Sequence, residues 1–108
     1  MILVTTENVA GYKVQEVKGQ VFGIVVRSRG AIPNFFAQIK SFFGGEISEY
    51  TSMLEDARSQ ALDRMTKNAI ALGANGIIMF RFDSSSMDGN MSETIAYGTA
   101  VWLDKLDD

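Results

Sequence analysis

The chain has 108 residues, 46% hydrophobic and 21% charged, a composition typical of a globular domain, so we expect one domain over residues 1–108. It contains neither cysteine nor histidine, which excludes a disulfide framework, a zinc finger, a thiol nucleophile and any catalytic triad that uses an imidazole. Ten basic and thirteen acidic residues give a formal net charge of −3, which argues against nucleic acid as a partner.

The compartment can also be inferred from composition. Residues 1–7 do not have the pattern of a signal peptide, and the longest apolar runs fall well short of the ~18 residues that a membrane-spanning helix needs. The absence of cysteine fits a reducing compartment. We therefore expect a cytoplasmic protein with no membrane partner.

The first half of the chain predicts two strands and a short helix. Residues 2–5 form a short apolar segment suited to an edge strand. Residues 14–27 are rich in valine and predict a long strand, bent or bulged at Gly19 or Gly23, two glycines that would let another backbone approach closely. Residues 30–45 predict a short amphipathic helix with an apolar face. That face consists of Ile32, Phe35, Phe36, Ile39, Phe42 and Phe43.

The second half predicts a long helix followed by two strands. Residues 50–72 contain no glycine or proline, and Gly73 is suited to end the helix as a left-handed cap. Residues 76–82 and 94–103 predict strands, joined by a polar hairpin loop over residues 83–93. The predicted apolar stripe of the helix is Leu54, Ala57, Ala61, Met65 and Leu72.

This order of elements predicts a two-layer α+β domain, in which a small antiparallel sheet packs against one long helix and a short amphipathic helix. The small residues Ala96, Gly98 and Ala100 share one face of the last strand, where a helix can lie close. Several strands are apolar on both faces, although two helices cover only one face of a sheet. We therefore expect a homo-oligomer that buries the remaining apolar surface. The alternative is a monomer whose sheet is covered by its own helices and loops.

Arg58 is the polar residue with the most unusual position, because it falls within the apolar arc of the long helix. A guanidinium there must be paired or must reach the helix edge along its stem. The preceding carboxylates Glu46, Glu49 and Glu55 favour an ion pair within or between subunits. The alternative is that Arg58 lines a pocket and binds an anion or a carboxylate.

Metal binding would depend on unusual ligands in this chain. Without thiolates and imidazoles, a site would have to use carboxylates, carbonyls or methionine thioethers. Met87 and Met91 lie four residues apart beside Asp88, and thioethers can hold Cu(I). Methionine more often fills gaps in a core, so we expect neither a metal site nor a cofactor.

Five short motifs occur in order along nearly the whole chain. They are Gly44-Gly45-Glu46, Tyr50-Thr51, Ala57-Arg58 with Ala61, Leu72-Gly73-Ala74-Asn75-Gly76, and Tyr97-Gly98-Thr99-Ala100-Val101. With these motifs the chain resembles the YbjQ-like family, bacterial and archaeal proteins that carry a heavy-metal-binding label. The resemblance implies a dodecin-like subunit, with a small antiparallel sheet against a helix, and a ring assembly, in the first place a pentamer. It implies no enzymatic activity.

Four polar residues, Glu46, Tyr50, Thr51 and Arg58, match positions of the family motifs and are candidates for a ligand pocket or a subunit interface. We expect Arg58 to be buried near a subunit boundary and to meet a carboxylate. The leading hypothesis is a non-catalytic homo-oligomer that acts as a scaffold or binds a small ligand where subunits meet. One alternative is a metal-binding protein with carboxylate or methionine ligands, and another is an unrecognised enzyme built on Glu46, Tyr50 and Arg58.

Overall fold

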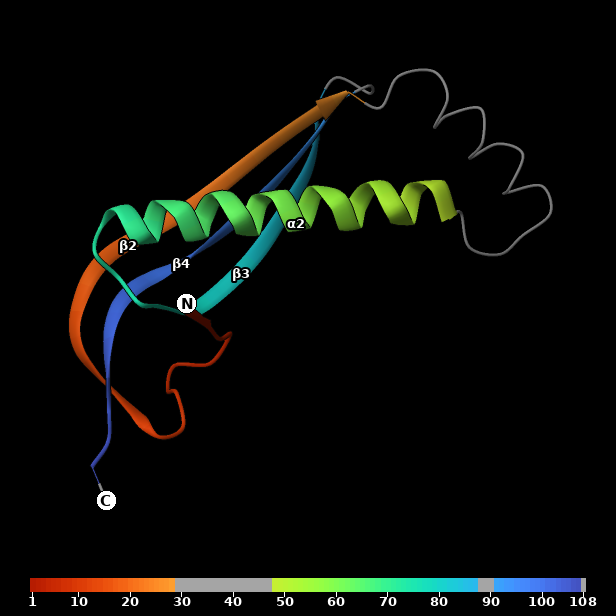
Figure 1. Cartoon of the computed structure of the whole chain (residues 1–108). Helices are drawn as coiled ribbons and strands as arrows, with labels where there is room; N and C mark the ends of the chain where they lie inside the picture. The colour runs from red at the N-terminus through yellow and green to blue at the C-terminus, as the bar shows by residue number, and fades with distance from the viewer. Residues whose placement is uncertain (29–47, 88–90, 108) are drawn as a thin grey trace.

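The computed structural model describes residues 1–28, 48–87 and 91–107, and within them a long helix packs against one face of a four-stranded sheet (Figure 1). The α+β, two-layer prediction is confirmed at this level. The predicted helix over residues 30–45 lies outside the described residues. The elements are β1 (Ile2–Leu3), β2 (Tyr12–Ser28), α2 (Ser48–Ala71), β3 (Gly76–Met87) and β4 (Met91–Lys105).

The sheet is mixed, with the strand order β1-β3-β4-β2. The pairs β3–β4 and β2–β4 are antiparallel, but β1 runs parallel to β3. The prediction of an antiparallel sheet is therefore wrong at this edge. The parallel pair is possible because β2 and α2 lie between β1 and β3 in the chain and supply the long connection that parallel strands need.

The hairpin of β3 and β4 is longer than the sequence pattern predicts. Strand pairing continues as far as Met87 and Met91, so most of the predicted loop over residues 83–93 belongs to the sheet. Ser84 and Ser85 lie opposite Thr94 and Glu93. Antiparallel strands accept polar residues where one face meets solvent, which is why a serine-rich segment that resembles a loop forms a strand here.

The buried stripe of α2 consists of small residues and one methionine. Ala57, Ala61, Met65 and Ala69 follow one another at intervals of four residues and are at most 6% exposed. Leu54 and Leu72, which the sequence placed in this stripe, are 48% and 46% exposed, so that part of the prediction is wrong. Each lies three residues beyond an end of the row, and a three-residue step turns a side chain about 60° out of line. Within the described part of the chain, no helix is both long and apolar enough to cross a membrane.

The two glycines of β2 have different roles. A Cβ atom at Gly23 would overlap the carbonyl oxygen of Ala61 and lie 2.5 Å from the amide nitrogen of Met65, so Gly23 confirms the predicted close approach of another backbone. Gly19 has open space around it, but its φ of 129° and the register shift after Val17 place it at the predicted bulge. Gly23 therefore brings α2 against β2, whereas Gly19 bends the strand.

The turn from α2 into β3 is held by a glycine and an asparagine. Gly73 has a φ of 84°, which confirms the predicted left-handed cap. The Asn75 side chain donates to the carbonyl oxygen of Leu103 at 2.9 Å and accepts from its amide at 2.6 Å. A Cβ atom at Gly76 would lie 2.5 Å from Leu103 Cδ1. The segment Leu72 to Gly76, one of the family motifs, is thus explained by architecture.

A β-bulge in β3 explains a second motif. The register shifts between Ile78 and Arg81, which leaves Met79 and Phe80 opposite Gly98 of β4. Met79 has a φ of 58°, a backbone conformation that residues other than glycine rarely adopt. A Cβ atom at Gly98 would lie 3.0 Å from the Cβ of Phe80. Gly98 therefore makes room for the bulge.

Candidate functional site

An open hollow of about 400 Å³ lies between the first half of α2 and the ends of β3 and β4. The helix residues that line it are spaced about one turn apart, so their side chains emerge on the same side of α2. The two strand residues that line it, Ser84 and Thr94, are cross-strand partners. The lining residues are Thr51, Leu54, Glu55, Arg58, Ser84 and Thr94.

Arg58 lies in this hollow as an exposed cation. Its guanidinium carbon is 5.1 Å from the centroid of the Phe82 ring, a cation–π contact. The ion pairs among the described residues join other side chains, namely Lys18 with Glu16, Arg27 with Asp56, and Lys67 with Asp63. The expected burial of Arg58 beside a carboxylate is therefore not found in the single chain. The reason is that its long stem carries the guanidinium from the apolar arc to the edge, where the Phe82 ring supports it.

Thr94 is the buried polar residue of this region, with 4% of its surface exposed. Its side-chain hydroxyl makes no hydrogen bond to any residue that the structure describes. A buried hydroxyl normally has a partner, and leaving it without one costs free energy. Because Thr94 also lines the hollow, its hydroxyl is a candidate contact for a bound molecule.

The structure places two of the four residues predicted for the site in the hollow. Thr51 and Arg58 both line the hollow, so the structure brings these two together. Glu46 lies outside the described residues, and Tyr50 is placed within α2 by its backbone alone. The sequence analysis did not identify Ser84 and Thr94 as site residues. Only strand pairing brings them beside the helix, and no local motif marks them.

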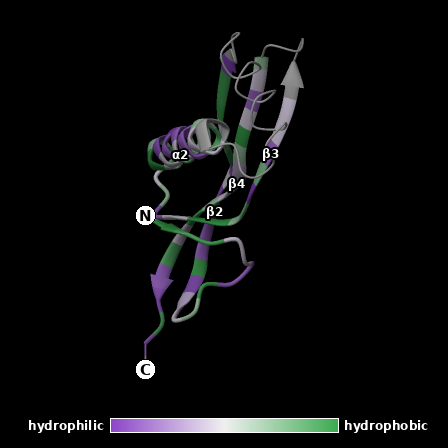
Figure 2. Ribbon diagram, turned by 90° about the vertical axis from the view of Figure 1, so that its right-hand side faces the viewer, coloured by the Kyte–Doolittle hydropathy of each residue, from purple (hydrophilic) through white to green (hydrophobic). Residues whose placement is uncertain are grey.

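A second feature is an apolar surface on the side of the sheet that faces away from α2, which we call the outer sheet face. It is formed by Phe22, Ile24 and Val26 of β2 together with Tyr97 of β4, which are 49%, 39%, 47% and 44% exposed. Phe22 lies directly opposite Tyr97, and Ile24 opposite the half-buried Ile95. Figure 2 shows α2 beside one face of the sheet that β2, β3 and β4 form. Large side chains at adjacent positions on two paired strands make this patch continuous.

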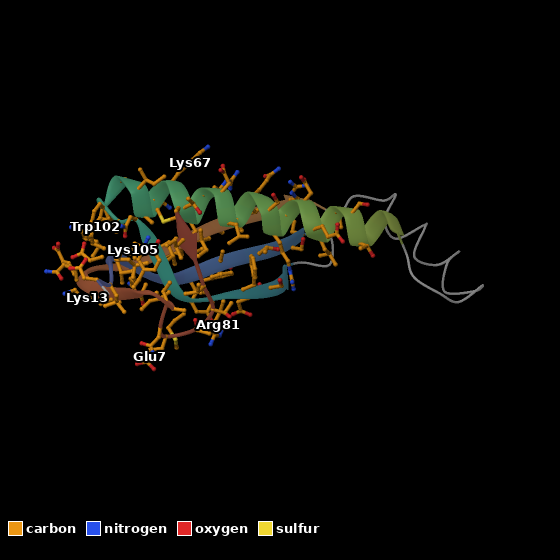
Figure 3. The ribbon with its side chains drawn as sticks, turned by 60° about the horizontal axis from the view of Figure 1, so that its bottom comes forward. Glu7, Lys13, Lys67, Arg81, Trp102 and Lys105 are labelled. Atoms are coloured by element: carbon orange, nitrogen blue, oxygen red, sulfur yellow. The ribbon has the colours of Figure 1, made fainter. Side chains whose placement is uncertain are left out.

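Arg81 borders the outer sheet face. It is the cross-strand partner of Tyr97 on the β3 side and donates from Nη1 to the carbonyl oxygens of Thr5 and Phe80, at 2.7 and 2.8 Å. Figure 3 places Arg81 on the side of the sheet away from α2, whereas Lys67 lies on the solvent side of the helix. Arg81 thereby ties the N-terminal segment to β3.

Part of the free edge of β2 is occupied by side chains of α2. Asn68 Nδ2 donates to the carbonyl oxygen of Phe22 at 2.8 Å, and Arg64 donates to the carbonyl oxygen of Ile24. Unpaired strand edges are the usual places where another strand adds to a sheet. Here the helix satisfies two of the edge carbonyls beside the outer sheet face.

The sequence lacks the two ligand types that most often hold soft heavy metals. These are thiolate and imidazole groups, and the chain contains no cysteine or histidine, so methionine thioethers are its only soft ligands. Among the described residues no three acidic side chains come together as a metal-binding group. Met87 and Met91 are cross-strand partners at the end of the hairpin.

Comparison with known proteins shows the family. A family model described as "Putative heavy-metal-binding" and named YbjQ matches residues 1–104. The chain belongs to the YbjQ family. A UPF0145 protein of Bradyrhizobium sp. (strain ORS 278) is 57% identical over 104 residues, covering 96% of this chain and 94% of the relative. A UPF0145 protein of Sulfurisphaera tokodaii is 53% identical over 105 residues, covering 97% and 92%.

The fold is shared with a more distant solved structure. A crystal structure of a protein of unknown function from Pediococcus pentosaceus, assigned to the DUF74 family, superposes with a TM-score of 0.69. The two chains are 18% identical, and the match covers 96% of this chain and 98% of the other. For this YbjQ chain, the heavy-metal description of the family finds no thiolate or imidazole ligand in the sequence.

Proposed function

We propose that this YbjQ protein is a non-catalytic subunit of a homo-oligomer, and that its copies meet through the outer sheet face. The observation that carries the proposal is the burial pattern of β2, in which every second residue from Val21 to Val25 is buried while Phe22, Ile24 and Val26 are exposed. A contiguous apolar patch of this kind marks an interaction site in soluble proteins. A second copy of the same chain is the simplest partner, and in a ring the outer sheet face of one copy meets a different surface of the next.

The packing of α2 favours association by the face of the sheet over extension of its edge. The carbonyl oxygens of Phe22 and Ile24 at the β2 edge already accept hydrogen bonds from Asn68 and Arg64. A strand added at this edge would have to break both bonds. A neighbouring copy placed on the outer sheet face leaves them intact and removes the aromatic surface from water.

The number of copies and the role of the assembly are part of the same proposal. The YbjQ resemblance favours a closed ring, in the first place a pentamer, because head-to-tail contacts that close produce rings. Such a ring acts as a scaffold or holds a small ligand where its subunits meet. We place it in the cytoplasm, since a chain without cysteine suits a reducing compartment.

The test is the mass in solution of the wild-type chain and of Phe22→Glu. One chain weighs 11.9 kDa, so light scattering of the wild type should give a multiple of this mass, and five copies for a pentamer. Phe22→Glu places a charge within the apolar contact and should lower the mass toward that of one chain, because an unpaired buried charge is costly. A wild-type mass near 11.9 kDa at micromolar concentration contradicts the proposal.

The matched control is Ile70→Glu, which makes the same kind of change on the helix. Ile70 is 58% exposed on α2, on the opposite side of the molecule from the outer sheet face. We expect Ile70→Glu to keep the wild-type mass. If Ile70→Glu dissociates the assembly and Phe22→Glu does not, the copies meet through the helix and the proposed interface is wrong.

A further inference from the structure

We propose that the hollow between α2 and the β3–β4 hairpin is a binding site for a small organic carboxylate, with Arg58 as the residue that holds its charge. The inference does not depend on assembly, because the lining residues that the structure describes all come from one chain. Three features support it. Among the described residues, a cation has no carboxylate partner, a buried hydroxyl has no hydrogen bond, and the charges lining the hollow suit one negative group.

The first feature is the state of Arg58. Its guanidinium lies 5.1 Å from the centroid of the Phe82 ring and forms no ion pair within the described part of the chain. A guanidinium has five N–H donors in a planar fork that matches the two oxygens of a carboxylate. The contact with Phe82 positions the group without using any carboxylate that the structure describes, so the donors remain for a bound molecule.

The second feature is Thr94, on the floor of the same hollow. It is 4% exposed, and no described residue offers a hydrogen-bond partner to its hydroxyl. A valine would fill the same volume without this cost, so an unpaired hydroxyl here has no structural purpose. A polar group of a ligand that enters the hollow would satisfy it. Its strand partner Ser84 adds a second hydroxyl at the same level.

The third feature is the charge balance, which narrows the class of ligand. Arg58 and Glu55 both line the hollow, three residues apart on α2. A doubly charged phosphate would meet the carboxylate of Glu55, whereas a monocarboxylate matches one guanidinium and leaves Glu55 to accept from an amine or a hydroxyl. Leu54, 48% exposed, offers apolar contact. The hollow of about 400 Å³ suits a small molecule, such as a free apolar amino acid or the corresponding 2-hydroxy acid.

The test is isothermal titration calorimetry of the full chain with four matched probes. They are L-leucine, 2-hydroxy-4-methylpentanoate, isopentylamine, which has the same carbon tail without a carboxylate, and inorganic phosphate. We expect saturable binding of at least one of the two carboxylates and none of isopentylamine or phosphate. The proposal is overturned if neither carboxylate binds, or if isopentylamine or phosphate binds as tightly.

Variants assign the binding to the hollow. Arg58→Gln should weaken the carboxylate at least about ten-fold, because a charged hydrogen bond is lost. Lys67→Gln removes the same charge from the same helix, outside the hollow, and should leave the affinity unchanged. Equal affinities of Arg58→Gln and the wild type overturn the assignment.

Thr94→Val is a second variant that keeps the shape of the hollow and removes its buried hydroxyl. It should bind the carboxylate several-fold more weakly while remaining folded. Unchanged affinity in Thr94→Val removes Thr94 from the proposed site. The mass of each variant by light scattering separates a failure of binding from a failure of assembly, so the two proposals can fail independently.

Discussion

The two faces of the sheet differ in the size of their side chains and in what covers them. The inner face carries Gly23, Ala96 and Ala100, and the backbone of α2 lies directly against it. The outer sheet face carries Phe22 and Tyr97, both more than 40% exposed. Small residues are needed where a helix must approach a strand closely, whereas large apolar residues contribute most when a broad surface is buried. The small residues of the inner face are explained by the close approach of α2, whereas the large residues of the outer sheet face are the surface on which we propose that another copy packs.

We expect the largest loss of stability from adding a side chain at Gly23, where the inner face of the sheet lies closest to α2. Gly23→Ala would put a Cβ atom into the Ala61 carbonyl oxygen and within 2.5 Å of the Met65 amide nitrogen. Because backbone blocks the new atom on the helix side, we expect the free energy of unfolding to fall by about 3 kcal/mol or more. Urea unfolding followed by circular dichroism measures this. Phe22→Ala, next in sequence on the outer sheet face, should cost the single subunit much less. A Gly23→Ala protein of wild-type stability would show that α2 can move away from β2.

We expect an intermediate loss of stability at the turn between α2 and β3, where the Asn75 side chain bonds to β4. Asn75→Ala removes the hydrogen bonds to the amide and the carbonyl of Leu103. We expect a loss of about 2 kcal/mol, at roughly 1 kcal/mol for each bond. Thermal unfolding by calorimetry is the measurement. Asn68→Ala is the control, since it loses one exposed bond, to Phe22, and should cost less than half as much. Equal losses in the two variants would contradict a special role for the turn.

The smallest effect has the opposite sign and concerns Thr94, the buried polar residue among those the structure describes. Thr94→Val should raise the free energy of unfolding by about 1 kcal/mol, because it removes a buried hydroxyl that no described residue satisfies. Chemical denaturation without ligand measures it. Thr99→Val, at a half-buried position of β4, is the comparison and should change stability less. Destabilisation by Thr94→Val would mean that the hydroxyl has a partner in the folded protein.

The sequence predicted the elements more reliably than their ends or their exposure. The long helix, its cap at Gly73 and the glycine contact at Gly23 are confirmed, because each depends on local chemistry or on a missing side chain. Leu54 was assigned to the core, yet it lines the hollow. Periodicity shows which side chains share a helix face, but it does not show where along the helix the sheet ends.

Two of the residues that line the hollow were candidates from the sequence, and two others were not. Thr51 and Arg58 were identified from their positions in motifs and on the helix, and they lie in the same hollow. Ser84 and Thr94 reach it through the pairing of β3 with β4, which the serine-rich segment concealed. The cation–π contact of Arg58 with Phe82 joins residues on different elements, so spacing along the chain carried no sign of it.

The sequence by itself determined the composition of the two faces, the stop of the helix at Gly73 and the absence of thiolate and imidazole ligands. Each of these depends on the identity of residues, or on preferences that act over a few neighbours. Tertiary structure alone decided that β1 runs parallel to β3, that Met79 bulges opposite Gly98, and that a cation and a buried hydroxyl meet in one hollow. These features require contacts between segments far apart in the chain, and their energies depend on packing that no local pattern encodes.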